Sequence, residues 1–304
     1  KKPTSRGSSS DSAAVPLSRE TAPMSGGPDT ARRSPTAHYT GYVWVREGLA
    51  DPRMATRSGR ILHALMAPVA RMGSRFFAGY TLDDTLLQRH RIIDALLDGE
   101  IAAGARAVVE IAAGLSPRGQ RITAAHADLA YVEGDLPGMA RRKRTAVARM
   151  GSAARNHHVV TLNALAAVGP GSLASIGRRF FEADEPAVVI TEGLLNYFDQ
   201  TAVEGLWTRI ASFLAGRSRG AYFAEILVGE DVLPHVGARA FIPVVSAFAG
   251  GHVHLHYPTV AAAEAALLRS GFGSVTVHSP TEWRDRVDIP VRRRDVLRVV
   301  EARA

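Results

Sequence analysis

The chain has 304 residues, 46% of them hydrophobic, which is enough to bury the core of one enzyme-sized α/β domain. It contains no cysteine, so disulfide bonds, thiolate metal sites and thiol nucleophiles are excluded. The net charge of +8 is compatible with a nucleic-acid partner. However, the charge is mostly scattered arginine, aromatic residues make up only 7%, and no nucleic-acid-binding motif occurs, so no such partner is expected.

The N-terminal segment differs from the rest in composition. Residues 1–34 are rich in Ser, Pro, Gly and Arg and have almost no large apolar side chain, which predicts a disordered tail before a single domain at residues 35–304. No secretory signal and no apolar run long enough to span a bilayer is evident. A cytoplasmic protein without a membrane partner is therefore expected, while the oligomeric state is left open.

Helices come first in the predicted domain, at residues 41–48, 57–72 and 82–98. Short β-branched runs that alternate with helices then predict strands at residues 107–111, 129–133, 158–162, 187–191, 220–226, 274–278 and 296–301. The segment 231–257 interrupts this alternation. Together with the leading helices, it is expected to form a lid over the carboxyl edge of the sheet.

The first strand leads into a glycine turn and a helix. Val108, Val109 and Ile111 suit a parallel strand that is covered on both faces. Gly114 allows a tight turn beneath a ligand, and Pro117 suits the first position of the next helix. This pattern is typical of the first βα crossing of a nucleotide-cofactor fold.

The second strand ends in two acids, Glu133 and Asp135. Ligands of open α/β sheets lie at the carboxyl ends of strands, where an acid can accept hydrogen bonds from ribose hydroxyls. The dinucleotide fingerprint G-x-G-x-x-G is not met, because Ala112, Gly114 and Pro117 stand at its glycine positions. S-adenosylmethionine, which carries no phosphate, suits both the glycine turn and the acid.

Four blocks of the sequence match motifs of a known family. They are residues 89–94 (RHRIID, for R-x-x-x-(I/L)-D), 111–117 (IAAGLSP, for L-G-A-G-L-D-T), 131–137 (YVEGDLP, with Lys143 and Arg144 behind it, for E-x-D-x-P…K-R) and 191–197 (TEGLLNY, for (A/T)-E-G-(L/V)-L-x-Y). Through them the chain resembles the leucine carboxyl methyltransferase family of S-adenosylmethionine-dependent O-methyltransferases. Residues 37–42 and 110–119 are most similar to its bacterial branch of tetracenomycin-type polyketide methyltransferases.

The resemblance implies a Rossmann-like class I methyltransferase fold. This fold has a seven-stranded, mostly parallel sheet with an antiparallel last strand, helices on both faces and an N-terminal helical lid. It also implies that S-adenosyl-L-methionine is the cofactor, with Arg89 at its carboxylate, Gly114 under its aminoacyl end, Asn163 near adenine and Glu192 beneath the site. The full set of implied cofactor residues is Arg89, Glu110, Ala112, Gly114, Glu133, Asp135, Asn163, Ala164 and Glu192.

The chain departs from the family pattern in three places. Ala112 replaces the first glycine of the turn, Ser116 replaces a common aspartate, and Asn163 replaces an aspartate at the adenine edge. An asparagine still donates and accepts hydrogen bonds there. Only one acid of the second strand is expected to meet the ribose: the family pattern favours Asp135, and the position at the strand end favours Glu133.

The predicted function is O-methylation of a carboxyl or hydroxyl group on a small aromatic or polyketide-like molecule. Aromatic and imidazole side chains suit a planar acceptor, although Trp44 and Phe198 are expected in the core. Two alternatives are a protein C-terminal carboxylate as acceptor and a non-catalytic basic binding protein. The predicted acceptor residues are His38, Tyr39, Tyr42, Tyr197 and His254.

No catalytic base and no metal are assigned. A carboxylate acceptor is already ionised at neutral pH, whereas a phenol, with a pKa of about 10, would gain from a base. His252, His254 and His256 would share one face of a strand. Imidazoles at alternate strand positions lie about 7 Å apart, too far to converge easily on one ion, so a polar wall of the substrate pocket is favoured.

Overall fold

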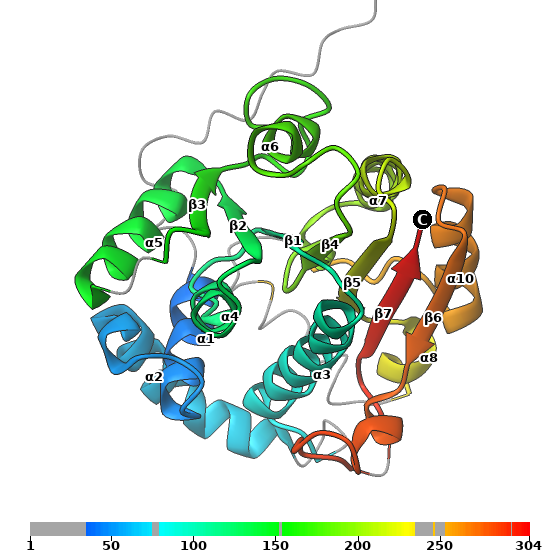
Figure 1. Cartoon of the computed structure of the whole chain (residues 1–304). Coiled ribbons are helices and arrows are strands. Elements are labelled where there is room, and N and C mark those ends of the chain that lie inside the picture. The colour runs from blue at the N-terminus through cyan, green and yellow to red at the C-terminus, as the bar shows by residue number, and fades with distance from the viewer. Residues whose placement is uncertain (1–34, 75–78, 152–153, 235–245, 247–252, 293) are drawn as a thin grey trace, which may run out of the picture.

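The computed structural model describes residues 35–74, 79–151, 154–234, 246, 253–292 and 294–304. The predicted tail at residues 1–34 lies outside the described residues, as does His252. One sheet in the order β3-β2-β1-β4-β5-β7-β6 forms the centre of the fold (Figure 1). Its strands are β1 (Ala107–Ile111), β2 (Ala130–Asp135), β3 (His157–Thr161), β4 (Ala187–Thr191), β5 (Gly220–Ile226), β6 (Ser274–His278) and β7 (Arg298–Arg303).

The sheet is parallel from β3 to β5, and β7 pairs antiparallel with both β5 and β6. The predicted seven-stranded sheet with an antiparallel last strand is therefore confirmed. The helices are α1 (Pro35–Arg46), α2 (Arg57–Ser74), α3 (Leu82–Ala102), α4 (Arg118–Ala125), α5 (Pro137–Met150), α6 (Leu173–Phe180), α7 (Gln200–Ala215), α8 (Gly229–Val232) and α10 (Val260–Arg269), with short 3-10 helices η1 (Pro52–Met54), η2 (Leu195–Tyr197) and η3 (Pro280–Trp283).

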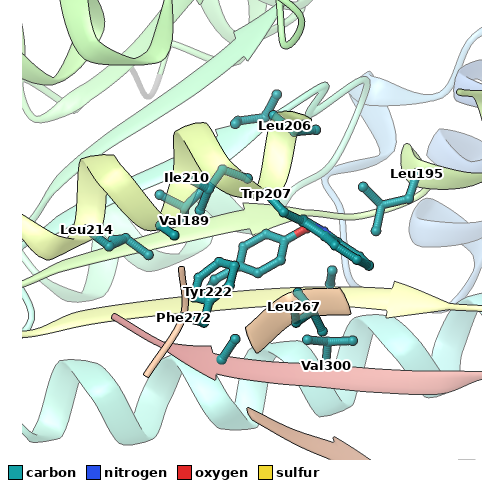
Figure 2. Packing of buried hydrophobic residues seen from close by; sticks show 14 of the residues in the cluster. Val189, Leu195, Leu206, Trp207, Ile210, Leu214, Tyr222, Leu267, Phe272 and Val300 are labelled. Carbon is teal, nitrogen blue, oxygen red and sulfur yellow. The ribbon is translucent and has the colours of Figure 1, made fainter. Parts of the chain in front are cut away.

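The central strands are apolar on both faces because helices cover both sides of the sheet. Side chains alternate along β4, so Val188 joins the cluster beneath α3 and α4, whereas Val189 joins the cluster beneath α6, α7 and α10. In the second cluster, Trp207 of α7 lies against Tyr222 of β5 (Figure 2) and donates a hydrogen bond of 3.2 Å to its hydroxyl. Thr191 shares the same hydroxyl at 2.6 Å, so both buried aromatic side chains have polar partners.

Helix α1 lies at the carboxyl edge of the sheet, whereas α3 covers one of its faces. Residues 235–245 and 247–252 of the predicted lid lie outside the described residues. Helix α1 packs so closely on the turn after β1 that a Cβ atom added to Gly41 would lie only 2.9 Å from the Cβ of Leu115. Helix α3 begins at a capping box in which Thr81 and Asp84 exchange hydrogen bonds with each other's backbone. In the part of the chain that the structure describes, no helix has both the length and the apolar composition needed to cross a bilayer.

Several predicted boundaries differ from the structure, among them those of the strands predicted at residues 129–133 and 296–301, which are Ala130–Asp135 and Arg298–Arg303. The first helix begins at Pro35, several residues before the predicted start at residue 41. Pro117 precedes α4 as its N-cap residue, so Arg118 and not Pro117 is the first helical residue. Proline has no N–H to donate, so it is tolerated at this boundary as well as one residue further on.

Candidate cofactor site

The turn after β1 is held to the end of β2 by Asp135. Gly114, with φ of +53°, donates its N–H to Asp135 Oδ2 at 2.8 Å, and the N–H of Leu136 reaches Oδ1 at 2.7 Å. Burial raises the pKa of the Asp135 carboxyl, and these two N–H groups oppose the rise. A carboxylate offers about four lone-pair sites, so Asp135 keeps acceptor capacity for ribose hydroxyls.

Ala112 adopts the same left-handed conformation, with φ of +56°, although it has a Cβ atom. Such a conformation costs about 1–2 kcal/mol for a residue other than glycine. Backbone strain of this kind gathers at ligand-binding turns. The alanine that replaces the family's first glycine is therefore strained in place.

Ala112→Gly is expected to raise the free energy of unfolding by about 0.5–1 kcal/mol, because it removes this strain but adds freedom to the unfolded chain. Gly114→Ala is the matched control in the same turn and is expected to lower the free energy of unfolding by about 1 kcal/mol. Urea denaturation measures both. A destabilised Ala112→Gly variant would contradict the assignment of strain to residue 112.

Glu133 lies inside the fold rather than at the edge of the sheet. Its side chain is 1% exposed, forms an ion pair with Lys143 Nζ at 2.7 Å and lies 3.0 Å from His157 Nε2. Burial alone would raise the pKa of Glu133, but the charge of Lys143 and the contact with His157 hold it below the usual range. Lys143 also donates to the Ser116 carbonyl at 2.7 Å, which fixes the turn. The ribose assignment stays a prediction, and this packing favours Asp135.

Asn163 and Ala164 follow β3, the strand next to β2. Asn163 is exposed, and its Oδ1 accepts from the N–H of Leu165 at 3.1 Å. The carbonyl of Ala164 accepts from Arg209 of α7 at 3.3 Å. Leu136 and Leu165 are both exposed in these two neighbouring loops, so apolar surface and an amide lie together beyond β2 and β3.

Arg89 of α3 is fixed between two acids. Its Nε donates to Glu192 at 3.1 Å, and Nη1 donates to Glu225 at 3.3 Å. A Cβ atom on Gly193 would lie 2.9 Å from Arg89 Nη2, so a larger residue there would displace the guanidinium, and the φ of +70° also favours glycine. Among the described residues, no hydrogen bond of Nη2 is found, which leaves this donor for an anionic group.

Glu225 holds the other side of the Gly193 turn. Both of its carboxylate oxygens accept from the Gly193 N–H, at 2.8 and 3.0 Å. Burial raises the pKa of Glu225, and the nearby charge of Arg89 opposes the rise. Sequence reasoning missed this residue, although an acid at the end of the apolar strand β5 was a usable signal.

Glu192 and Glu110 belong to a closed buried network around Arg118. The guanidinium of Arg118 donates to Asp94 at 2.6 Å, to Glu110 at 2.7 Å and to Glu192 at 2.7 Å. Burial alone would raise the pKa of Glu192, but the charges of His90, Arg118 and Arg89 hold it well below the usual range. Glu192 thus supports Arg89 from beneath, whereas Glu110 lies deeper and also accepts from the Tyr131 hydroxyl at 2.7 Å.

Replacing Glu192 is expected to change the acid dependence of stability. Its pKa is lower in the folded chain than the ordinary 4.5, so ionised Glu192 stabilises the fold above that pH, and the contribution is lost as the pH falls through the lowered value. The difference in free energy of unfolding between the natural chain and Glu192→Gln should stay constant from about pH 7 to about pH 5 and shrink as the pH falls further. Urea denaturation across this range tests it, and a difference that grows on acidification would contradict it.

The predicted acceptor residues fall into two groups, and the first lies within the helical cover. Tyr39 is 1% exposed and its hydroxyl donates to Asp83 at 2.6 Å. His38 is buried and hydrogen-bonds Thr56 at 3.1 Å. Tyr42 contacts the ring of His63 edge-on at 5.2 Å. The side chains of these three residues thus contact Thr56, Asp83 of α3 and His63 of α2, although α1 itself packs on the turn after β1.

The second group consists of Tyr197, which lies close to Arg89, and His254, which is hydrogen-bonded to Asn196, the residue before Tyr197. The N–H of His254 donates to the Asn196 carbonyl at 2.8 Å, and the side-chain amide of Asn196 donates to the His254 carbonyl at 2.7 Å. Tyr197 is 38% exposed, and its hydroxyl interacts with Thr36 at the start of α1 and with the charge of Arg89. The structure thus gathers α1, η2 and the segment before Tyr257 at one place.

Two predicted core residues are confirmed. Trp44 is buried and stacks on His90 with ring centroids 4.2 Å apart. Phe198 packs against the main apolar cluster. His256 lies in the same irregular segment as His254, with its Nε2 2.8 Å from the Phe198 carbonyl, so these histidines do not form a regular strand.

An antiparallel β7 between β5 and β6, a glycine turn after β1 and an acid at the end of β2 together define a Rossmann-like class I methyltransferase fold. The family model described as leucine carboxyl methyltransferase matches residues 45–211, and the chain belongs to this family. S-adenosyl-L-methionine is the cofactor that this membership assigns to the chain.

Individual relatives agree with this family. A protein of Mycolicibacterium gilvum named as an S-adenosyl-L-methionine-dependent methyltransferase is 32% identical over 136 residues, which cover 45% of this chain and 43% of that protein. A Streptomyces avermitilis protein named in the same way is 30% identical over 160 residues, or 53% of this chain and 54% of that protein. The match thus spans about half of the length of these relatives.

The fold is also similar to a solved structure from Thermobifida fusca whose title names it as a methyltransferase. The TM-score is 0.57 at 15% sequence identity, and the match covers 93% of this chain and 99% of that one. At this level of identity the likeness supports the fold alone.

Proposed function

We propose that this chain is an S-adenosylmethionine-dependent O-methyltransferase that acts on a carboxyl or hydroxyl group of a small aromatic or polyketide-like molecule. The observation that carries the proposal is the Arg89 guanidinium, held by Glu192 and Glu225 with Nη2 beside Gly193. A fixed cation with an available donor suits the carboxylate of an aminoacyl group. We take residues 35–304 as the functional domain.

The residues around this cation suit the remaining parts of the cofactor. In our proposal Arg89 binds the carboxylate, the turn at Gly114 lies under the aminoacyl chain, Asp135 accepts from the ribose hydroxyls and Asn163 meets the adenine edge. The apolar side chains of Leu136 and Leu165, exposed beyond β2 and β3, support the placement of a flat base there. When bound, S-adenosylmethionine supplies an activated methyl group on its sulfonium.

The chain itself mainly has to align the acceptor and exclude water. Alignment can contribute about 7–11 kcal/mol to the barrier reduction. Helix α1 covers the turn after β1, with Ala37 Cβ 3.5 Å from the position of a Cβ on Gly114, and so limits access of water to the aminoacyl end. A carboxylate acceptor needs no proton removed, and we assign no general base.

The choice of acceptor rests on Tyr197 and His254. Tyr197 lies near Arg89, and His254 is hydrogen-bonded through its backbone to the neighbouring Asn196. A partly exposed aromatic ring and an imidazole suit a planar acid. The likeness of residues 37–42 and 110–119 to the polyketide branch of the family supports the same class. A protein C-terminal carboxylate is the rival acceptor, because the family takes its name from a leucine carboxyl group.

Incubation with methyl-labelled S-adenosylmethionine and separate panels of aromatic acids, phenols and cell lysate tests this proposal. We expect label in an aromatic acid that is released by mild base, as for a methyl ester. Base-stable label in a phenol would shift the product to an ether and renew the search for a general base. Label in protein alone would overturn the small-molecule assignment.

A further inference from the structure

Arg118 is the most deeply buried charged side chain near the candidate site, with 0% exposure. Each nitrogen of its guanidinium donates to a different carboxylate: Nε to Asp94 Oδ1, Nη1 to Glu110 Oε1 and Nη2 to Glu192 Oε2. These acids come from α3, from β1 and from the segment after β4. One side chain therefore joins three elements at the carboxyl edge of the sheet.

Arg118 is also the first residue of α4, directly after the turn that contains Gly114. Its backbone is thus part of the connection that ends the turn, while its side chain reaches Glu192. Burial would lower the pKa of an isolated guanidinium, but the charges of Glu110, Asp94 and Glu192 raise that of Arg118 well above its usual value. The side chain is therefore held as a cation.

Glu192 binds Arg118 and Arg89 through different oxygens. Oε2 accepts from Arg118 Nη2 at 2.7 Å, and Oε1 accepts from Arg89 Nε at 3.1 Å. The plane of the Glu192 carboxylate is therefore set from the buried side by Arg118 together with His90, whose Nδ1 lies 3.0 Å from the same Oε2. That plane in turn sets the direction in which Arg89 presents Nη2 beside Gly193.

We propose that Arg118 is a positioning residue for the carboxylate of the cofactor's aminoacyl group, acting through Glu192 on Arg89. This inference rests on the proposed function, because it needs the cofactor carboxylate at Arg89. Lysine would keep the charge but not the planar fork that meets three carboxylates at once. Arg118→Lys is therefore expected to weaken the binding only of those ligands that carry the carboxylate.

Calorimetric titration with two ligands tests this inference. S-adenosylhomocysteine has the aminoacyl carboxylate, whereas 5′-methylthioadenosine keeps the adenine and ribose but lacks it. Arg118→Lys is expected to raise the dissociation constant of S-adenosylhomocysteine about tenfold and to leave that of 5′-methylthioadenosine within about twofold. An equal loss for both ligands would overturn the inference, because it would indicate a general disturbance of the site. Unchanged affinity for both would overturn it as well.

Coupling to Arg89 gives a second readout. If Arg118 acts through Arg89, then adding Arg118→Lys to Arg89→Met should cause little further loss of S-adenosylhomocysteine affinity. Additive losses would contradict the inference. Where Arg118→Lys does not fold, Arg118→Met/Glu110→Gln removes the cation together with one buried carboxylate, and the same confined loss is expected.

Glu100→Gln is the matched control. Glu100 is a buried acid at the far end of α3 that binds Arg219 at 2.7 Å and Arg303 at 2.7 Å. Its replacement disturbs the ion pairs of a buried acid away from the site and should leave both affinities unchanged. The natural chain distinguishes the two proposals: if it binds neither ligand, the proposed function fails, and if it binds both but Arg118→Lys shows no confined loss, only this inference fails.

Discussion

Arg89→Met is expected to raise the dissociation constant of S-adenosylhomocysteine about 100-fold. The substitution removes a cation whose hydrogen bonds to a carboxylate contribute roughly 1.5–3 kcal/mol each, and about 2.7 kcal/mol corresponds to that factor. Glu192 and Glu225 hold Arg89 in place before a ligand binds. Little side-chain entropy is therefore lost on binding, and most of the hydrogen-bond energy contributes to affinity. Isothermal titration calorimetry measures the loss directly.

Arg91→Met is the matched control on the same helix. Arg91 pairs with the exposed Asp288 at 2.6 Å and takes no part in the candidate site, so its loss should leave S-adenosylhomocysteine affinity unchanged. Equal affinities of Arg89→Met and the natural chain would refute the assignment of Arg89 to the cofactor carboxylate.

Lys143→Met is expected to lower the free energy of unfolding by about 3–5 kcal/mol, because breaking a buried ion pair leaves a charge without its partner. Lys143 is 3% exposed and pairs with Glu133, which is 1% exposed. It also donates to the Ser116 carbonyl, so the turn after β1 loses a support at the same time. Urea denaturation near neutral pH measures the change.

The double variant Lys143→Met/Glu133→Gln separates the charge effect from lost packing. It removes the unpaired carboxylate, so a large part of the lost stability should return. If Lys143→Met lowers the free energy of unfolding by less than about 1 kcal/mol, the pair contributes no more than an exposed ion pair does. That result would contradict its buried geometry.

Most of the sheet was predictable from local composition. Residues 187–191, 220–226 and 274–278 match β4, β5 and β6 without any shift. Central strands between two helical layers are apolar on both faces, and that run of side chains is visible in the sequence alone. The start of α1 was missed because its first residues, from Pro35, show no apolar repeat in the sequence. Their packing on the turn after β1 is visible only in the structure.

The site was predictable only in part, because its contacts join residues far apart in the chain. The turn at Gly114 and the acid Asp135 were visible as local signals at strand ends. Nothing local shows that Glu133 turns inward, since its partners Lys143 and His157 come from α5 and β3. The pairing of Arg89 with Glu225 likewise depends on how α3 packs beside β5.

The aromatic residues of α1 illustrate the same limit. Tyr39 was predicted to bind the acceptor because other aromatic residues stand close to it in the sequence. In the structure its hydroxyl donates to Asp83 at the start of α3, at 2.6 Å. Only the packing of α1 against α3 brings these two residues together.

Calorimetric titration of the natural chain with S-adenosylhomocysteine tests the central claim most directly. We predict saturable binding at one site per chain that is strongly weakened in Arg89→Met. Absence of saturable binding, together with tight and salt-dependent binding of nucleic acid, would contradict the claim and favour a non-catalytic basic protein on this fold.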